Sequence, residues 1–158
     1  MKKYLFSIAL IFLLSIEIKA HVDHYTKYNY LEYELFRNNK LIGYHKYKFQ
    51  RNGENLTIDN EVSFKIIKLG VNLYNYYAKG IEKYKNGVFT EFNSQTNQNK
   101  KEKYVNITID PLDKNLLIDG SSYKGKADKN ITIGTWWNHE IVQKKAQISA
   151  VSGRIIEQ

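Results

Sequence analysis

Residues that could do chemistry are few in this sequence, and their spacing matches no common catalytic motif. The chain has no cysteine and only four histidines. It contains no Gly-rich phosphate loop, no Gly-x-Ser-x-Gly turn and no His-x-x-x-His pair. His139 and Glu140 are adjacent, so they would not share one face of a helix. We therefore expect no catalytic residues, no cofactor and no enzymatic activity.

The remaining polar candidates have simpler interpretations than catalysis. His45 lies in an alternating stretch, where a lone histidine is more often a hydrogen-bonded core or boundary residue than a base. Glu32, Glu34 and Glu61 could pair as carboxylates, but a solvated face with lysine partners on the neighbouring strand is the simpler arrangement. These residues therefore predict an ordinary sheet surface.

Two histidines near the N-terminus could in principle bind a metal. If cleavage made His21 the first residue, its amine and imidazole could hold copper together with His24. A frayed terminus is the simpler interpretation. We predict no metal site.

The adjacent tryptophans Trp136 and Trp137 are the most suggestive local feature. They could line the mouth of an apolar pocket. Alternatively, one could plug the open side of a sheet while the other lies on its rim. With Val62, Phe64 and Tyr76 from the strands, the two tryptophans form the set that we predict to contact a ligand.

An alternating pattern predicts the strands that must position these residues. Along 56–65, apolar Leu56, Ile58, Val62 and Phe64 alternate with polar residues, which is typical of a strand with one buried face. Similar patterns predict strands at 28–36, 41–50, 56–67, 71–84, 88–96, 104–110, 116–118 and 131–135. Turns are expected at Asn38-Asn39, Asn52-Gly53, Asn86-Gly87 and Asp119-Gly120, and a polar loop at 95–103.

The pattern changes to helical spacing once. Asn138 could cap a helix whose first turn contains Glu140, and Ile141, Ala146 and Ile148 follow at helical spacing. We expect a short helix at about Asn138 to Gln147, packed on the concave side of the sheet. The predicted fold class is therefore mainly β: an antiparallel meander forming a curved sheet or half-barrel with one short helix.

The N-terminus has the three parts of an export signal. Lys2 and Lys3 precede an apolar run from Tyr4 to Ile16, and Ala20 offers a cleavage site. The run is shorter than the roughly 20 residues that span a bilayer, although an uncleaved signal helix anchored in a membrane is the alternative. We predict a signal peptide at 1–20, a flexible lead-in at 21–27 and a single β domain at 28–158. An exported chain without cysteines fits the bacterial periplasm.

The charge balance bears on the partners of the protein. The net charge is +8, which favours anionic partners such as an envelope surface. Scattered lysines that keep a sheet soluble are the simpler interpretation. Alternating tyrosine and lysine resembles a stacking platform for nucleic acid, but an exported protein seldom meets that ligand, so we expect no nucleic acid.

Several short segments, taken in order, resemble an uncharacterised family of exported bacterial proteins, domain of unknown function 6134. They are Tyr33-Glu34-Leu35, Ile42-Gly43-Tyr44-His45, Leu56-Thr57-Ile58, Tyr74-Asn75-Tyr76 and Trp137-Asn138. In that family Trp-Asn is usually followed by proline, where this chain has His139. The family continues for several strands beyond the turn at Gly153, so the resemblance implies a chain truncated at its C-terminus. It implies no catalytic residues, and its pattern is similar to periplasmic proteins with a curved sheet around a helix, including lipoprotein carriers.

These observations lead to one functional hypothesis and one alternative. The hypothesis is an exported, periplasmic protein that binds a lipid-like or other apolar ligand on the concave face of its sheet. The alternative is a non-enzymatic structural or interaction protein of the cell envelope, which would use edge strands and its lysine-rich face. The sequence predicts neither the ligand nor the oligomeric state.

Overall fold

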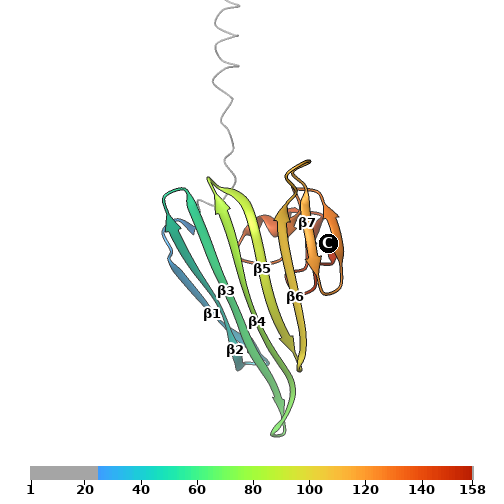
Figure 1. The fold of residues 1–158 in the computed structure, drawn as a ribbon. Helices are drawn as coiled ribbons and strands as arrows, with labels where there is room; N and C mark the ends of the chain where they lie inside the picture. The colour runs from blue at the N-terminus through green and yellow to red at the C-terminus, as the bar shows by residue number, and fades with distance from the viewer. Residues whose placement is uncertain (1–24, 158) are drawn as a thin grey trace, which may run out of the picture.

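The computed structural model describes residues 25–157, without the side chains of His139 and Glu140. The expected signal peptide and the histidines His21 and His24 lie outside these residues. Eight strands form one antiparallel sheet in sequence order (Figure 1). They are β1 (Tyr30–Arg37), β2 (Lys40–Asn52), β3 (Asn55–Lys68), β4 (Val71–Lys85), β5 (Val88–Gln98), β6 (Lys101–Ile109), β7 (Leu116–Gly120) and β8 (Lys124–Ala127). The predicted antiparallel meander is therefore confirmed.

Two-residue turns join the long strands, because their residues tolerate a left-handed backbone. Asn38 and Asn39 have φ angles of 49° and 60°, and Asn86 and Gly87 have 52° and 75°. Such angles match the twist of paired strands and explain why asparagine and glycine occur there. The predicted turns at these two places are confirmed.

The polar segment 95–103, predicted as a loop, instead continues β5 and β6. The two strands pair as far as Gln98 and Lys101, and the turn contains only Asn99 and Lys100. Polar residues misled the prediction because both faces of this part of the sheet carry them. The predicted turn at Asp119-Gly120 was also wrong, since both residues belong to β7.

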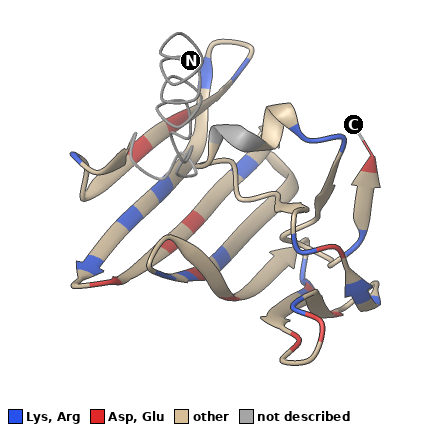
Figure 2. Ribbon diagram, turned by 90° about the horizontal axis from the view of Figure 1, so that it is seen from above, with Lys and Arg blue, Asp and Glu red and all other residues tan. Residues whose placement is uncertain are grey.

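A second, smaller sheet forms in residues 128–157, which we call the C-terminal segment. It contains β9 (Thr132–Ile133), β10 (Ala146–Ile148) and β11 (Ile155–Glu157), in the order β11-β10-β9. Side chains from the inner face of the large sheet hold this segment in place. Tyr47 donates to the Thr135 carbonyl at 2.8 Å, and Ser94 donates to the Ala150 carbonyl at 2.6 Å. The view from above shows the large sheet curving around the segment (Figure 2).

The predicted ten-residue helix was wrong. A 3-10 helix, η2, covers only His139–Gln143, and the chain then enters β10. Helices of this length are marginal on their own, whereas β10 pairs with two strands and buries Ile148 completely. Tertiary pairing therefore outweighs the helical spacing of the apolar residues. Among the described residues, no helix is long and apolar enough to cross a membrane.

The core of the molecule consists of two clusters on the inner face. The larger lies between β5–β8 and the small sheet, and the other lies on β2 and β3 beneath the C-terminal segment. The larger contains Phe92, Val105, Ile107, Leu116, Ile118, Ala127, Ile133 and Ile148; the smaller contains Tyr47, Phe49, Ile58 and Trp137. Toward the turns at 69–70 and 99–100 the inner face is left uncovered by these clusters, and a pocket opens there.

Candidate functional site: an aromatic pocket on the concave face

The pocket has a volume of about 490 Å³ and lies between the inner face of the sheet and the C-terminal segment. Strands β1 to β5 contribute its walls, together with two stretches of the C-terminal segment, one at Gly134 and Trp136 and the other at Ala150 and Val151. Cross-strand pairing explains how residues distant in sequence meet there. In one row across the sheet, His45 lies opposite Val62, Val62 opposite Ala78, and Ala78 opposite Thr96.

Three aromatic rings form one wall of the pocket. Phe64 stacks against Tyr76 with ring centroids 5.0 Å apart, and against Tyr74 at 5.8 Å. Phe64 and Tyr76 are opposite each other in the register of β3 and β4. Stacked rings of this kind offer a flat apolar surface that costs little conformational entropy to keep in place.

Trp136 lies on another side of the same pocket. Its side chain is 64% exposed, and its φ is 65°. A left-handed backbone is an outlier for a bulky residue. Such strain persists only where the surrounding structure imposes it, and it often marks ligand-binding positions.

The polar groups of the pocket are few. His45 Nε2 and Asn60 Oδ1 are 2.8 Å apart, and burial lowers the pKa of the His45 imidazole. This pair confirms that His45 is a hydrogen-bonded boundary residue. Thr96 is 1% exposed, and its hydroxyl makes no hydrogen bond of good geometry with another described residue. Burial raises the pKa of the Tyr76 phenol, and the neighbouring Thr96 hydroxyl counteracts the rise.

Of the five predicted ligand-binding residues, the structure brings four together. Val62, Phe64, Tyr76 and Trp136 all line the aromatic pocket. Trp137 is 2% exposed and lies in the smaller core cluster, with Phe49 at 6.0 Å between ring centroids. Trp136 therefore lies on the rim of the pocket, whereas Trp137 plugs the open side of the sheet.

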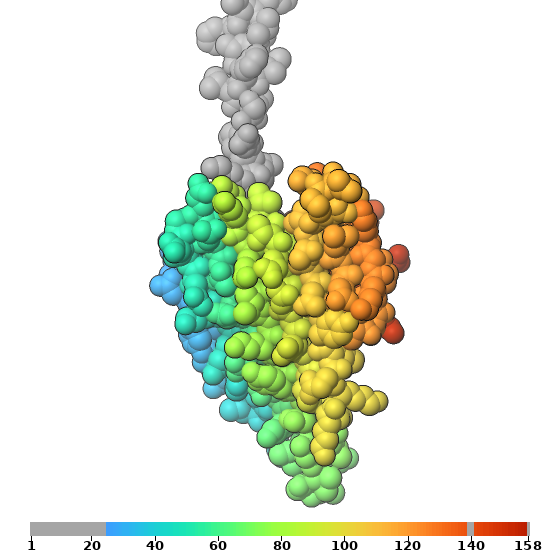
Figure 3. All heavy atoms as spheres, in the orientation of Figure 1, coloured from blue at the N-terminus to red at the C-terminus, as the bar shows by residue number. Residues whose placement is uncertain are grey.

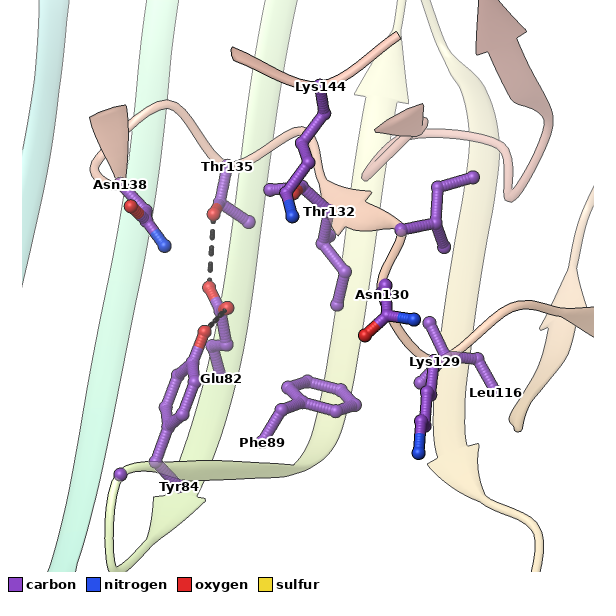
Figure 4. A pocket seen from close by; sticks show the side chains of 13 residues that line it. Glu82, Tyr84, Phe89, Leu116, Lys129, Asn130, Thr132, Thr135, Asn138 and Lys144 are labelled. Carbon is purple, nitrogen blue, oxygen red and sulfur yellow. Dashed lines mark hydrogen bonds between the residues drawn. The ribbon is translucent and has the colours of Figure 1, made fainter. Parts of the chain in front are cut away.

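A buried carboxyl group, missed by sequence reasoning, lies beside a second pocket of about 330 Å³ (Figure 4). Glu82 is 5% exposed and accepts hydrogen bonds from the Thr135 hydroxyl at 3.0 Å, from Trp137 Nε1 at 2.8 Å and from the Tyr84 hydroxyl. Burial raises the pKa of this carboxyl, and the three donors counteract the rise. Because Thr135 and Trp137 belong to the C-terminal segment, Glu82 ties that segment to β4.

Period-two spacing could have revealed this residue. Glu82 lies on β4 at the same parity as Tyr76, Ala78 and Tyr84, so it had to share their inner face. The same spacing applies to Thr96, which shares the parity of Phe92 and Ser94 on β5. Among residues 25–157, no group of three or more His, Cys, Asp or Glu side chains could hold a metal ion.

Comparison with known proteins gives one match. The model of the family described as "Domain of unknown function (DUF6134)" matches residues 33–158, a range that contains most of β1, all later strands, the pocket and the C-terminal segment. No match was found among the curated proteins or among the solved structures.

Proposed function

Because the chain belongs to the DUF6134 family, whose description assigns no activity, we propose a function from the pocket itself: the protein is a non-catalytic, periplasmic binding protein for a lipid-like apolar ligand. The aromatic pocket, with Trp136 exposed beside the stacked Phe64 and Tyr76, is the observation that carries this proposal. Its volume of about 490 Å³ falls in the usual range for sites that take small ligands.

The composition of the pocket favours an apolar chain with one polar end. The aromatic wall and Val62 would contact the chain, while the Thr96 hydroxyl and the His45–Asn60 pair would contact the polar end. Among the described residues that line the pocket, none is an aspartate, glutamate or arginine, and the one lysine, Lys79, is exposed. A polar end that can exchange hydrogen bonds, such as a hydroxyl, amide, ester or carboxyl group, would therefore suit them best.

The proposal can be tested with two variants on the same strand. The protein would be purified without detergent and divided into two samples. One would be extracted with organic solvent and the extract analysed by mass spectrometry, and the other would be titrated with a dansyl-labelled fatty acid. Tyr76→Ala removes a pocket ring and should lower affinity at least tenfold. Tyr77→Ala removes a ring that is 42% exposed and outside the pocket lining, and should leave affinity unchanged. Equal affinity for wild type and Tyr76→Ala would contradict the proposal.

The edge of the sheet favours a second candidate, an interaction protein of the cell envelope. Within residues 25–157, strand β1 pairs only with β2, and its Tyr30, Tyr33 and Phe36 are each at least 50% exposed. An unpaired edge can accept a strand from a partner. Crosslinking in cells to a partner through β1, together with an empty and folded protein after extraction, would favour this candidate.

A further inference from the structure

The end of the molecule formed by the β1–β2 and β3–β4 hairpins exposes large apolar side chains. The β3–β4 hairpin projects as the lowest part of the molecule (Figures 1 and 3). We define the apolar tip as residues 36–42 and 65–73. Its exposed apolar side chains, each 54% to 95% accessible, are those of Phe36, Leu41, Ile67, Leu69, Val71 and Leu73. A cluster of this kind on one end of a molecule marks an interaction site.

Leu69 carries the strongest indication within the tip. It is 95% exposed, and its φ is 50° in the turn between β3 and β4. Equivalent turns of this protein use Asn38-Asn39 and Asn86-Gly87, residues that tolerate such angles. A leucine there gains nothing from packing and strains the backbone, so folding does not explain its presence.

Four cations surround these apolar side chains. Arg37, Lys40, Lys65 and Lys68 are exposed, and none of them forms an ion pair with another residue in 25–157. The ranges 35–53 and 62–81, which form the tip and the strands behind it, contain no aspartate or glutamate. The tip therefore presents unbalanced positive charge around an apolar centre.

The tip is continuous with the aromatic pocket. A groove of about 880 Å³ runs between the two hairpins, with Leu41, Ile66 and Leu69 among its lining residues. Phe64 lines both this groove and the aromatic pocket. An apolar chain could thus pass from the tip to the pocket along one surface.

We infer that the apolar tip docks on the surface of a bilayer that contains anionic phospholipid. Leu69 and Ile67 enter the boundary between headgroups and acyl chains, while Arg37, Lys40, Lys65 and Lys68 contact phosphate groups. Apolar side chains ringed by lysine and arginine are the arrangement that suits this boundary, and each cation near an anionic surface adds to the attraction. The idea that a ligand then moves into the pocket rests on the proposed function; the docking itself does not.

A fluorophore at Leu69 tests the docking directly. The chain has no cysteine, so Leu69→Cys and the control Leu112→Cys can each be labelled at one position with nitrobenzoxadiazole. Leu112 is 91% exposed but lies outside the tip. With vesicles of phosphatidylglycerol and phosphatidylcholine, we expect a blue shift and several-fold brighter emission at position 69 and no change at position 112. Unchanged emission at position 69 would overturn the inference.

Charge reversal tests the electrostatic part and separates this inference from the proposed function. Lys65→Glu with Lys68→Glu should weaken sedimentation with the same vesicles at least tenfold but leave dansyl fatty acid binding unchanged. Tyr76→Ala should do the reverse. Equal binding of wild type to pure phosphatidylcholine vesicles would overturn the charge argument, and a tip-dependent dimer in analytical ultracentrifugation without vesicle binding would replace the bilayer by a second copy of the chain.

Discussion

Trp136 illustrates how a single residue can be selected for something other than stability. Its backbone is left-handed and its ring is mostly exposed, so it gains little from burial. Trp137, the next residue, is buried in the core and donates to Glu82. Neighbouring residues of the same type thus have separable roles, and substitutions can distinguish them.

We predict that Trp136→Gly is more stable than Trp136→Ala by about 1 kcal/mol, because glycine accepts a left-handed backbone at no steric cost. Both variants should lose affinity for the dansyl fatty acid.

Trp137→Ala should instead reduce the free energy of unfolding by about 3–5 kcal/mol, since it leaves a cavity in the core. Urea unfolding curves measure the free energy of unfolding of the two Trp136 variants and of Trp137→Ala. Equal stability of the two Trp136 variants would show that the backbone there is unstrained.

Glu82 leads to a prediction about pH. Its carboxyl has a folded-state pKa above the ordinary value of 4.5, because burial disfavours the charged form. The stability that Glu82 contributes is therefore complete below pH 4.5 and is lost as the pH rises through the folded-state pKa.

The Glu82→Gln variant isolates this contribution. The free energy of unfolding of wild type minus that of the variant should fall with rising pH above 4.5, by up to about 1.4 kcal/mol per pH unit. The subtraction removes groups such as Glu91 and Asp113, whose pKa values are lowered by their partners and whose effects have the opposite sign. A difference that rises with pH in urea titrations would contradict the raised pKa.

At the scale of the elements, the C-terminal segment depends on a close approach to the large sheet. A β-carbon on Gly120 would lie 2.6 Å from the Ser152 carbonyl oxygen and 2.9 Å from the Gly153 α-carbon. Both neighbours are backbone atoms, so they cannot rotate away. Gly120 is therefore glycine because of this contact and not because of a turn.

We predict that Gly120→Ala reduces the free energy of unfolding by about 1–3 kcal/mol, which is the usual range for overpacking. Gly87→Asn is the matched control. A β-carbon on Gly87 would meet no other atom within 4 Å, and asparagine tolerates the φ of 75° at this position. The control should lose only the small cost of a left-handed asparagine backbone, which is less than the loss in Gly120→Ala. Equal loss in both variants would mean that the contact with Ser152 does not matter.

The elements also show what the sequence could and could not predict. Hairpins were predictable because alternation and Asn or Gly turns act between residues close in sequence. The C-terminal segment was not, because its position is set by contacts across long separations, such as Tyr47 with Thr135, 88 residues apart. Those contacts turned a helical pattern into the short η2 and the strand β10.

The pocket was predictable in part for the same reason. Val62, Phe64 and Tyr76 follow from strand parity and from pairing between consecutive strands. Which of the two tryptophans would face them could not be read from the sequence. Buried Glu82 accepts a hydrogen bond from the Trp137 indole, which keeps Trp137 in the core and leaves Trp136 at the rim of the pocket.

At the scale of the whole molecule, packing is uneven from one end to the other. The two core clusters and the C-terminal segment cover the inner face over the middle strands, where Ile58, Phe92 and Ile107 are at most 1% exposed. The apolar tip extends past them, and among the described residues its strand ends pair only within their own hairpins. Regions with few buried contacts open most readily in the native state.

We therefore predict a gradient of hydrogen exchange along β3 and β4. Amides of residues 67–73 should exchange at least 100-fold faster than those flanking Ile58 and Ile81, measured by mass spectrometry on peptides that separate the two ends. Amides of β5 and β6 near Phe92 and Ile107 provide the slow reference, because the larger core cluster covers them. Vesicles of phosphatidylglycerol and phosphatidylcholine should slow exchange in 67–73 alone, since docking at the tip leaves the core unchanged. Uniform exchange along both strands would show that the projecting hairpin is as firmly packed as the centre.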